Sequence, residues 1–415
     1  MRPKILLATT CRWVAPARLA MAFRHAGCEV DMVCPAGHPV VHTGACGRTY
    51  RYHGLAPLDS ICAAMEDGRP KMVIPCDDLA CTHLHEIHAQ AVRQGDSGKE
   101  VRALVERSLG DPANYSLVDA RSRLIALARE LGVATPETGA ISSVEELPGW
   151  IAQLGLPLVL KTDGTSGGVG VRIVASEEEA VRAFRKLDAP PRLSRVIKRA
   201  IFDQDRTLFA PWLQRRRPVV NVQRYLPSSD ATIAVACWRG EILASISTEV
   251  LRTWRPRGPS SVVRLINNRE TNREMLQGAE KIVSHLKLSG LCGFDFVVEQ
   301  KTGKAYLIEM NPRATQTCHL PLGTGHNLPV ALAAAVSEEA QPQTASVTDG
   351  EVIALFPLEW QNDGASPFLR TAYHDVPWEE PRLVQFCARS KLNNGGWLTY
   401  ENLDRMLALL PWRRS

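Results

Sequence analysis

Short apolar runs alternate with helical patterns through the first hundred residues of this chain. The runs occur at Ile5 to Ala8, Val30 to Cys34 and Met72 to Pro75, and a helical pattern lies near Ala17 to Ala26. Strand-sized apolar runs separated by helices are typical of βαβ units, in which the strands lie parallel. The sequence therefore predicts an α/β domain with a parallel sheet over residues 1–111.

The charge of the chain is nearly balanced. Its 415 residues include 49 Lys plus Arg and 44 Asp plus Glu, which gives a formal net charge of +5. An excess this small and dispersed does not indicate a nucleic-acid partner. The run Arg215 to Arg217, bracketed by Pro211 and Pro218, is interpreted as a solvated loop.

The sequence favours a cytoplasmic protein with no membrane partner. No apolar run reaches the roughly 18 residues of a membrane helix. The start MRPKILLATT also lacks the apolar region and small-residue cleavage site of a secretory signal. The 11 cysteines include no CxxC pair, so reduced thiols are expected rather than a disulfide framework.

The stretch CDDLACTHLHEIH, residues 76–88, gathers possible metal ligands. Its cysteines, histidines and aspartate match no standard zinc spacing. We interpret the stretch as a strand end followed by an ordinary helix, and its role stays open.

The middle of the chain is rich in strand-like runs. A helical pattern at Leu117 to Leu131 is closed by Gly132, and a second one follows at Asn272 to Leu286. Two strands, Phe294 to Glu299 and Ala305 to Glu309, are expected to form a hairpin through a turn at Gly303. The other strand-like runs are 156–161, 169–174, 219–225, 232–238 and 242–250.

Glycines cluster in KTDGTSGGVGV, residues 161–171, directly after an apolar strand. Without a Cβ, such a loop brings its backbone N–H groups within hydrogen-bonding distance of a polyphosphate. Lys161 would add a fixed positive charge there. A glycine-rich hairpin turn with no ligand is the alternative.

Acidic and amide side chains mark the predicted hairpin. Residues two apart on a strand point to one face, so Glu309, Asn311 and Arg313 of IEMNPR should project together. Hairpin pairing can bring Asp295 beside Glu309. Carboxylate and amide oxygens suit magnesium, and Arg313 could stabilise charge on a transferring phosphoryl group. A surface cluster of salt bridges is the alternative.

With these two motifs, the sequence resembles the ATP-grasp superfamily, in the branch of carboxylate–amine ligases with a biotin carboxylase-like ATP-binding domain. KTDGTSGGVGV matches the loop that closes over ATP, and FDFVVEQKTGKAYLIEMNPR matches the hairpin that carries magnesium. The similarity runs from about Pro112 to Ala335. It implies a Rossmann-like domain at 1–111, an α+β ATP-grasp domain with antiparallel sheets at 112–340, and a C-terminal cap at 341–415. The small lobe would span about 135–222 and the large lobe about 223–340.

The resemblance implies a nucleotide site. Lys161 would contact the α- and β-phosphates, and Arg121 stands where relatives have a phosphate-binding lysine. Backbone groups of Arg224 and Leu226 would read adenine, and Gln223 stands where many relatives have glutamate. Asp230 would lie near the ribose. The cover over the phosphates would include Gly164, Ser166, Gly167, Gly168 and Gly170.

The resemblance also implies the cation site and the reaction. Asp295, Glu309 and Asn311 would hold two Mg²⁺ ions, with Mn²⁺ as a substitute, and Arg313 would steady an acyl phosphate. The reaction implied is phosphorylation of a carboxylic acid by ATP, followed by attack of an amine. The small-molecule partners are therefore an acid and an amine, and a homodimer is possible.

A substrate carboxylate needs its own cation. Arg252, Arg257 and Arg264 lie in the proline-rich stretch LRTWRPRGPSSVVR, where a substrate-facing loop is expected. Of these, Arg264 joins Lys161 and Arg313 as a candidate catalytic residue. Two alternatives stay open: a carboxylase acting on bicarbonate and a nucleotide sensor without turnover. Thr317 stands where carboxylases have a catalytic glutamate, and His319 is a conceivable substitute. Cys318 is expected to be a buried small residue.

Overall fold

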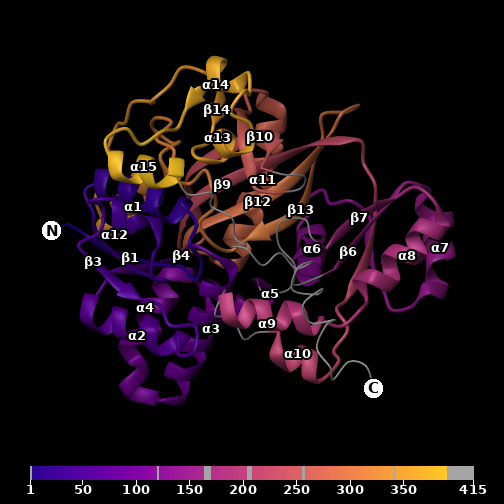
Figure 1. Cartoon of the computed structure of the whole chain (residues 1–415), viewed down its shortest axis with the longest axis horizontal. Coiled ribbons are helices and arrows are strands. Elements are labelled where there is room, and N and C mark those ends of the chain that lie inside the picture. The colour runs from indigo at the N-terminus through magenta and orange to yellow at the C-terminus, as the bar shows by residue number, and fades with distance from the viewer. Residues whose placement is uncertain are drawn as a thin grey trace. The chain divides into compact units, whose positions relative to one another are not determined.

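The computed structural model describes residues 2–118, 121–162, 170–202, 208–254, 258–340 and 342–389, without the side chains of 121, 122, 195, 198 and 200–202. The chain divides into two compact units (Figure 1). The first unit comprises Met1–Tyr52, Leu58–Glu137 and Leu226–Ala388, and the second comprises His53–Pro57, Thr138–Tyr225 and Arg389–Ser415. The domain boundaries predicted at 111 and 340 stay a prediction.

The first unit begins with the predicted parallel sheet. Its strands are β1 (Lys4–Ala8), β2 (Glu29–Cys34), β3 (Arg48–Arg51) and β4 (Met72–Pro75), in the order β3-β2-β1-β4. All neighbouring strands of this sheet are parallel. The expectation of an α/β domain is therefore confirmed.

Helices cover both faces of this sheet, because its central strands are apolar on both sides. Leu6, Ala8 and Val73 pack against α2 (Pro57–Gly68), α3 (Asp78–Arg93) and α4 (Lys99–Leu109). On the opposite face lies α1 (Ala15–His25), as Figure 1 shows. The Cα registers place the ends of β1 and β4 side by side, with Ala8 opposite Pro75.

A second sheet of seven strands forms the rest of the first unit, in the order β13-β12-β9-β10-β11-β14-β15. All its pairs are antiparallel except β14 with β15. Its strands are β9 (Ser228–Trp238), β10 (Glu241–Thr253), β11 (Ser260–Leu265), β12 (Gly290–Glu299), β13 (Ala305–Asn311), β14 (Val352–Ala354) and β15 (Tyr373–His374).

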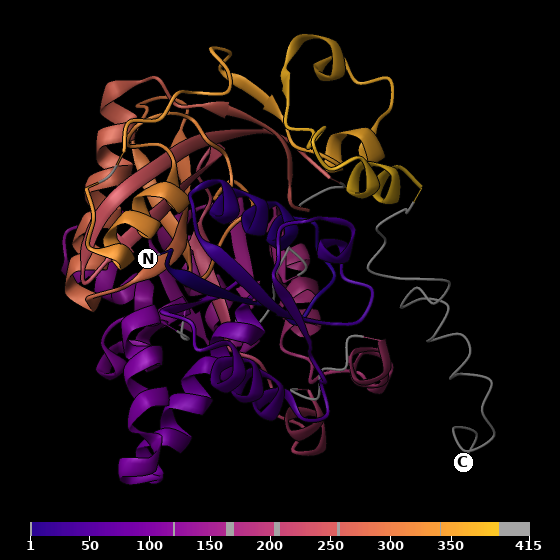
Figure 2. The ribbon, with the colours of Figure 1, turned by 90° about the vertical axis from the view of Figure 1, so that its left-hand side faces the viewer.

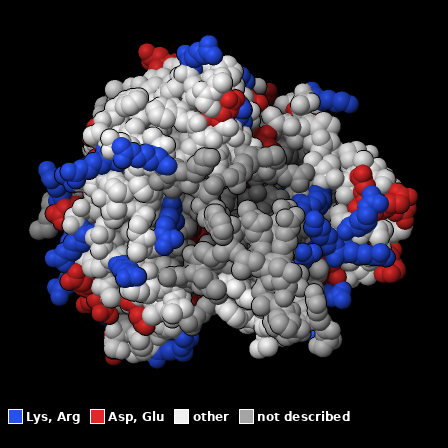
Figure 3. All heavy atoms as spheres, viewed as in Figure 1, with Lys and Arg blue, Asp and Glu red and all other residues white. Residues whose placement is uncertain are grey.

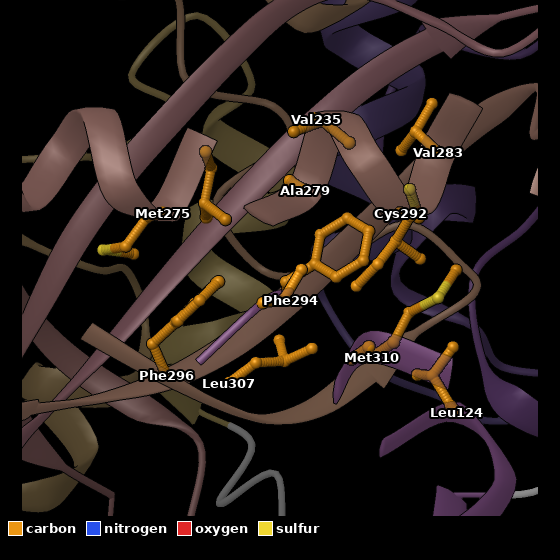
Figure 4. Close-up of a cluster of buried hydrophobic side chains, with 14 of the residues drawn as sticks. Leu124, Val235, Met275, Ala279, Val283, Cys292, Phe294, Phe296, Leu307 and Met310 are labelled. Atoms are coloured by element: carbon orange, nitrogen blue, oxygen red, sulfur yellow. The ribbon is translucent and has the colours of Figure 1, made fainter. Parts of the chain in front are cut away.

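The helix α11 (Arg269–Leu286) buries its apolar face against this sheet. Met275, Ala279 and Val283 lie one helical turn apart and meet side chains of β9, β12 and β13 (Figure 4). The short helices α5 (Tyr115–Val118) and α6 (Arg121–Glu130) add Val118 and Leu124 to the same core. Gly132 ends α6 at a φ of 69°, as predicted from its position.

The segment after α12 (Leu328–Ser337) contributes β14 and β15, which form one edge of the seven-stranded sheet (Figure 2). Its elements after β14 are α13 (Leu358–Asn362), α14 (Phe368–Thr371), β15 and α15 (Pro381–Arg389). Asp375 of this segment is buried and pairs with Arg18 of α1. Its Oδ2 also lies 2.7 Å from His319 Nε2. Burial raises the pKa of the Asp375 carboxyl, but its contacts with His319 and Arg18 lower it below the usual value.

The second unit contains a four-stranded antiparallel sheet in the order β5-β8-β6-β7. Leu158, Leu160 and Val222 on one face pack against α7 and α8. Its elements are β5 (Thr138–Ile141), α7 (Leu147–Leu154), β6 (Leu158–Thr162), β7 (Val171–Val174), α8 (Glu177–Leu187), α9 (Leu193–Phe202), α10 (Phe209–Leu213) and β8 (Val220–Arg224).

The surface carries charges of both signs. Lys and Arg side chains are interspersed with Asp and Glu side chains over the face drawn in Figure 3, in keeping with the small net charge of +5. Among the residues that the structure describes, no helix combines the length and the apolar character needed to cross a membrane.

Candidate functional site

The hairpin of β12 and β13 separates apolar from polar side chains. Phe294 and Phe296 of β12 point into the core with Leu307 and Met310 of β13 (Figure 4). The residues between them, Asp295 and Glu309, are only partly buried and lie opposite each other in the register. The pairing of Asp295 with Glu309 that the sequence predicted is therefore present.

A β-bulge makes this separation possible. The register steps from Asp295↔Glu309 to Phe296↔Leu307, so Ile308 is an extra residue on β13. Strict alternation would put Leu307 and Glu309 on one face, because they are two residues apart. The bulge instead lets Leu307 and Met310, three residues apart, both enter the core. Sequence reasoning missed the bulge, although the spacing of these two apolar residues is a signal for it.

Asp295, Glu309 and Asn311 meet at the end of the hairpin. Asn311 Nδ2 donates a hydrogen bond to Asp295 Oδ2 at 3.1 Å, and Gly293 lies opposite Asn311. A Cβ on Gly293 would come within 2.4 Å of Thr315 Cγ2. Any larger residue at this position would therefore force the Thr315 side chain to shift.

This arrangement fits a hard divalent cation. Two like charges directly opposite each other on paired strands destabilise a sheet, and a cation between Asp295 and Glu309 would remove that cost. Magnesium is held by one or two carboxylates, with water and substrate phosphates completing its shell. The described residues contain no group of three or more His, Cys, Asp or Glu arranged for a metal, so this site depends on Asp295, Glu309 and the Asn311 amide.

Arg313 lies beyond the strand, not on it. We expected it to project from the strand with Glu309 and Asn311, but β13 ends at Asn311. Pro312 follows and has no N–H to continue the ladder. The Arg313 guanidinium nevertheless returns to the site, where Nη2 donates to Asn311 Oδ1 at 3.1 Å. The expectation that Arg313 lies on the strand was therefore wrong, but its side chain does lie beside Asn311 as expected.

Carboxylates surround the Arg313 guanidinium. Its Nε donates to Asp78 Oδ1 at 2.7 Å. Burial alone would lower the pKa of this guanidinium, but the charges of Asp78, Asp77 and Asp295 together raise it. Arg313 is therefore a permanent cation beside the two hairpin carboxylates. Sequence reasoning did not single out Asp78, because 235 residues separate it from Arg313.

The stretch 76–88 has the predicted secondary structure, with β4 ending at Pro75 and α3 beginning at Asp78. Its polar side chains mostly contact neighbouring elements. Asp77 caps α3 through Ala80 N at 2.9 Å and accepts hydrogen bonds from Thr9 and Thr10 at the end of β1. His88 Nε2 lies 2.9 Å from Glu106 Oε1 of α4.

Lys161 lies on the face of the β5-β8-β6-β7 sheet that points away from the packed helices. In the register Lys161 is opposite Asn221, and Val159 is opposite Gln223. Because residues two apart share a face, Lys161, Asn221 and Gln223 form one polar group there. Asn221 was not singled out by sequence reasoning. As predicted, β6 and β7 form a hairpin around the glycine loop, with Thr162 N donating to Gly170 O at 3.0 Å.

The remaining nucleotide-site candidates are spread over both units. Arg224 ends β8, and the division between the units falls between Tyr225 and Leu226. Asp230 is an exposed residue of β9, opposite Val297. Arg121 is the first residue of α6, but its side chain lies outside the described residues. The loop residues Gly164, Ser166, Gly167 and Gly168 also lie outside them.

The stretch LRTWRPRGPSSVVR is largely strand. We expected a substrate-facing loop, but Arg252 lies on β10 and Arg264 on β11, so that expectation was wrong for both. Arg252 Nη1 pairs with the fully buried Glu359 at 3.0 Å and with Asp363 at 3.4 Å. Arg264 is exposed and pairs with Glu249 at 3.2 Å. Arg257 lies outside the described residues.

The segment after Arg313 is buried. Thr317, Cys318 and His319 are all shielded from solvent, and Cys318 accepts a hydrogen bond from Thr315 N at 3.2 Å. Burial raises the pKa of the Cys318 thiol, so it is a poor nucleophile, as its expected packing role requires. His319 is bound to Asp375, which gives it a structural partner.

Comparison with protein families gives one match at the second sheet. Residues 216–355 match the family described as "ATP-grasp in the biosynthetic pathway with Ter operon". The matched segment contains β8 to β13 and therefore the whole hairpin with Asp295, Glu309 and Asn311.

A curated relative is the carbamoyl phosphate synthase large chain of Methanothermobacter thermautotrophicus, 28% identical over 206 residues. The match covers 49% of this chain and 18% of the relative, so the chain spans less than a fifth of the length of that protein.

Two solved structures share the fold. Biotin carboxylase of Campylobacter jejuni, in a β,γ-ATP complex, has a TM-score of 0.58 at 15% identity, covering 83% of this chain and 74% of the other. N5-carboxyaminoimidazole synthetase of Staphylococcus aureus with ADP has a TM-score of 0.56 at 12% identity, covering 82% and 79%. The parallel sheet followed by antiparallel sheets is thus the arrangement of these enzymes.

Proposed function

We propose, on the premise that this chain belongs to the ATP-grasp superfamily, that it is an ATP-dependent ligase. It would activate a substrate carboxylate as an acyl phosphate and join it to an amine, with release of ADP and phosphate. The observation that carries the proposal is the set of Asp295, Glu309, Asn311 and Arg313 at the end of one hairpin. Two carboxylates, an amide and a permanent cation together suit phosphoryl transfer.

The polar face of the second unit would bind the nucleotide. Lys161 offers an ammonium on the strand that leads into the glycine loop, and Gln223 offers an amide on the neighbouring strand. An amide oxygen can accept the adenine amino proton where a carboxylate would otherwise do so. The backbone of Arg224 and Leu226 and the side chains of Arg121 and Asp230 complete the proposed set. Gly164, Ser166, Gly167 and Gly168 would cover the phosphates.

Asp295, Glu309 and Asn311 would hold magnesium, with manganese as a substitute. When bound, the metal neutralises phosphate charge and orients the oxygens of the triphosphate. The carboxylates themselves supply no proton, because both are needed in their ionised form. Asp295 and Glu309 lie on two paired strands backed by a packed core, which would keep the separation of the two carboxylates constant.

The reaction would proceed in two displacements. A carboxylate oxygen of the acid attacks the γ-phosphorus, and the bond between that phosphorus and the bridging oxygen of ADP breaks. The amine nitrogen then attacks the acyl carbon, loses a proton and expels phosphate. Arg313 would stabilise the charge that develops on the phosphoryl oxygens in both steps. Positioning of the two substrates supplies much of the remaining rate enhancement.

Arg264 would bind the substrate carboxylate. Of the two described arginines of its stretch, Arg252 faces two carboxylates, one of them buried, whereas Arg264 pairs with the partly exposed Glu249. An exposed pair costs little to break, so the contact with Glu249 does not prevent Arg264 from binding a substrate. The registers nevertheless place Arg264 in line with Glu249, Ala231 and Phe296, on the face of the sheet opposite Asp295, so its role in binding the acid rests on the sequence resemblance alone. The homodimer expected from sequence stays a proposal.

The test is an assay of ADP and phosphate release with Mg-ATP and pooled carboxylic acids, with and without pooled amines. A separate arm supplies bicarbonate in place of the acids. Glu309→Gln is the inactive variant, and Glu299→Gln, at the far end of β12, is its matched control. Release that needs both an acid and an amine, and is lost only in Glu309→Gln, supports the ligase.

Other outcomes of the same assay contradict the ligase. Release with bicarbonate alone would establish the carboxylase instead. Nucleotide binding without release in any pool would favour a sensor.

A further inference from the structure

Three separate contacts hold the guanidinium of Arg313. Its Nε donates to Asp78 Oδ1 at 2.7 Å, Nη1 to Ala314 O at 3.3 Å, and Nη2 to Asn311 Oδ1 at 3.1 Å. Ala314 and Asn311 are neighbours in the chain and offer neutral oxygens. Asp78 is the only charged group among the three, and a charge-assisted hydrogen bond is about twice as strong as a neutral one.

The backbone on both sides of this contact is fixed. Asp78 is the first residue of α3, and Asp77 before it is tied to Thr9, Thr10 and Ala80. On the other side, Ala314 N donates to Pro75 O at 3.0 Å, which joins the segment after β13 to the end of β4. The distance between Asp78 and Arg313 is therefore set by the packing of the parallel sheet against the hairpin within the first unit.

A simpler role for Asp78 is to stabilise α3. Acidic residues in the first turn interact favourably with the partial positive charge of a helix N-terminus. That role needs no partner, however, and would leave the carboxylate in solvent. Here the Asp78 side chain is 56% exposed but still contacts Arg313, whose side chain is only 18% exposed. The contact thus holds an arginine that is largely shielded from water.

We infer that Asp78 is a positioning residue, which holds the Arg313 guanidinium beside Asn311 so that the cation is in place before the substrates bind. The role of Arg313 in catalysis rests on the proposed function, but the contact itself does not. A guanidinium whose Nε is held by a charged partner has fewer orientations to lose when the phosphoryl group arrives. The parallel sheet would in this way contribute to a site whose other members belong to the hairpin.

The first experiment measures the exposure of Arg313 without any substrate. The full chain is treated with phenylglyoxal, an arginine reagent, and modification of the Arg313 peptide is followed by mass spectrometry. Asp78→Asn should raise the rate severalfold, because the amide has lost the charge that holds Nε. Asp78→Glu should stay near the wild-type rate. The matched control is Asp59→Asn, which removes an acidic residue from the first turn of α2 and should leave Arg313 unchanged.

The second experiment uses the acid and amine found by the release assay. Asp78→Asn should lower kcat by about tenfold to a hundredfold, with the KM for Mg-ATP within about twofold of wild type. Asp78→Glu should recover much of the loss. A helix-stabilising role alone predicts equal effects of Asp78→Asn and Asp59→Asn and no recovery with Glu.

The two experiments separate the two proposals. An unchanged rate of Arg313 modification in Asp78→Asn overturns the positioning role whatever the activity. Faster modification, restored by Asp78→Glu, supports that role even if no pair of substrates gives turnover, and the ligase proposal then fails alone. Faster modification with unchanged kcat would also overturn the positioning role, because the orientation of Arg313 would then not matter to the reaction.

Discussion

Two hairpins carry the residues that we assign to phosphate chemistry, and they are built differently. In the first unit, β12 is ten residues long and pairs with both β9 and β13. In the second unit, β6 and β7 have five and four residues and flank the glycine-rich stretch. Both hairpins bury one face in a hydrophobic core.

The difference reflects what each hairpin presents. Carboxylates that hold a cation must keep their separation, so they lie on long strands backed by Phe294, Phe296 and α11. A loop that offers backbone N–H groups needs close approach more than side-chain placement, which glycine provides. Four variants test whether the first hairpin is indeed the rigid element and the second the nucleotide-binding one.

The largest effect is expected in the core behind the cation site. Phe294 is completely buried, so Phe294→Ala should destabilise the first unit by about 3–5 kcal/mol, through lost burial and the cavity left behind. Calorimetry of the unfolding transition measures the change. Ile173→Ala on the half-exposed face of β7 is the control, with an expected change below about 0.5 kcal/mol. Equal effects of both variants would remove the contrast between the hairpins.

Asp295→Asn should separate stability from function. The change removes a like charge opposite Glu309, so the thermal transition should stay or rise slightly. Turnover should fall by about a hundredfold or more, because a cation ligand is lost. The release assay and a melting curve on the same sample check this. A variant that loses stability together with activity would mean that the carboxylate pair stabilises the hairpin.

Lys161→Met should affect nucleotide binding and leave the fold intact. Lys161 is a partly exposed residue on the polar face of β6, and methionine keeps most of its apolar stem. Loss of one phosphate contact should weaken Mg-ATP binding by about tenfold, as a charged hydrogen bond contributes roughly 1.5–3 kcal/mol. Calorimetric titration gives the Kd. Lys186→Met in the last turn of α8 should bind like wild type.

Arg264→Ala should have the smallest effect on the fold. Its exposed pair with Glu249 contributes about 0–1 kcal/mol, whereas the KM for the substrate acid should rise severalfold. Arg252→Ala is the informative comparison. It leaves the buried Glu359 carboxylate without its cationic partner and should destabilise the chain. An unchanged KM for the acid in Arg264→Ala would mean that a residue other than Arg264 binds the substrate carboxylate.

Local patterns in the sequence were sufficient for much of the architecture. The spacing of apolar runs predicted β1, β2 and β4, and the pairing of Asp295 with Glu309 followed from a hairpin around Gly303. These predictions succeeded because strand periodicity and turn chemistry depend on neighbours in the chain. The motifs around Lys161 and Glu309 also pointed to the ATP-grasp superfamily, and an ATP-grasp family model matches residues 216–355.

Contacts between distant segments were decided only by the tertiary structure. The bulge at Ile308 arises because Leu307 and Met310 share one core. Arg252 and Arg264 have similar sequence surroundings, but packing gave one a buried carboxylate and the other a partly exposed one. Asp78 meets Arg313 across 235 residues, because the sheet and the hairpin pack together. A single sequence does not encode such partners locally, since they depend on which surfaces become buried against each other.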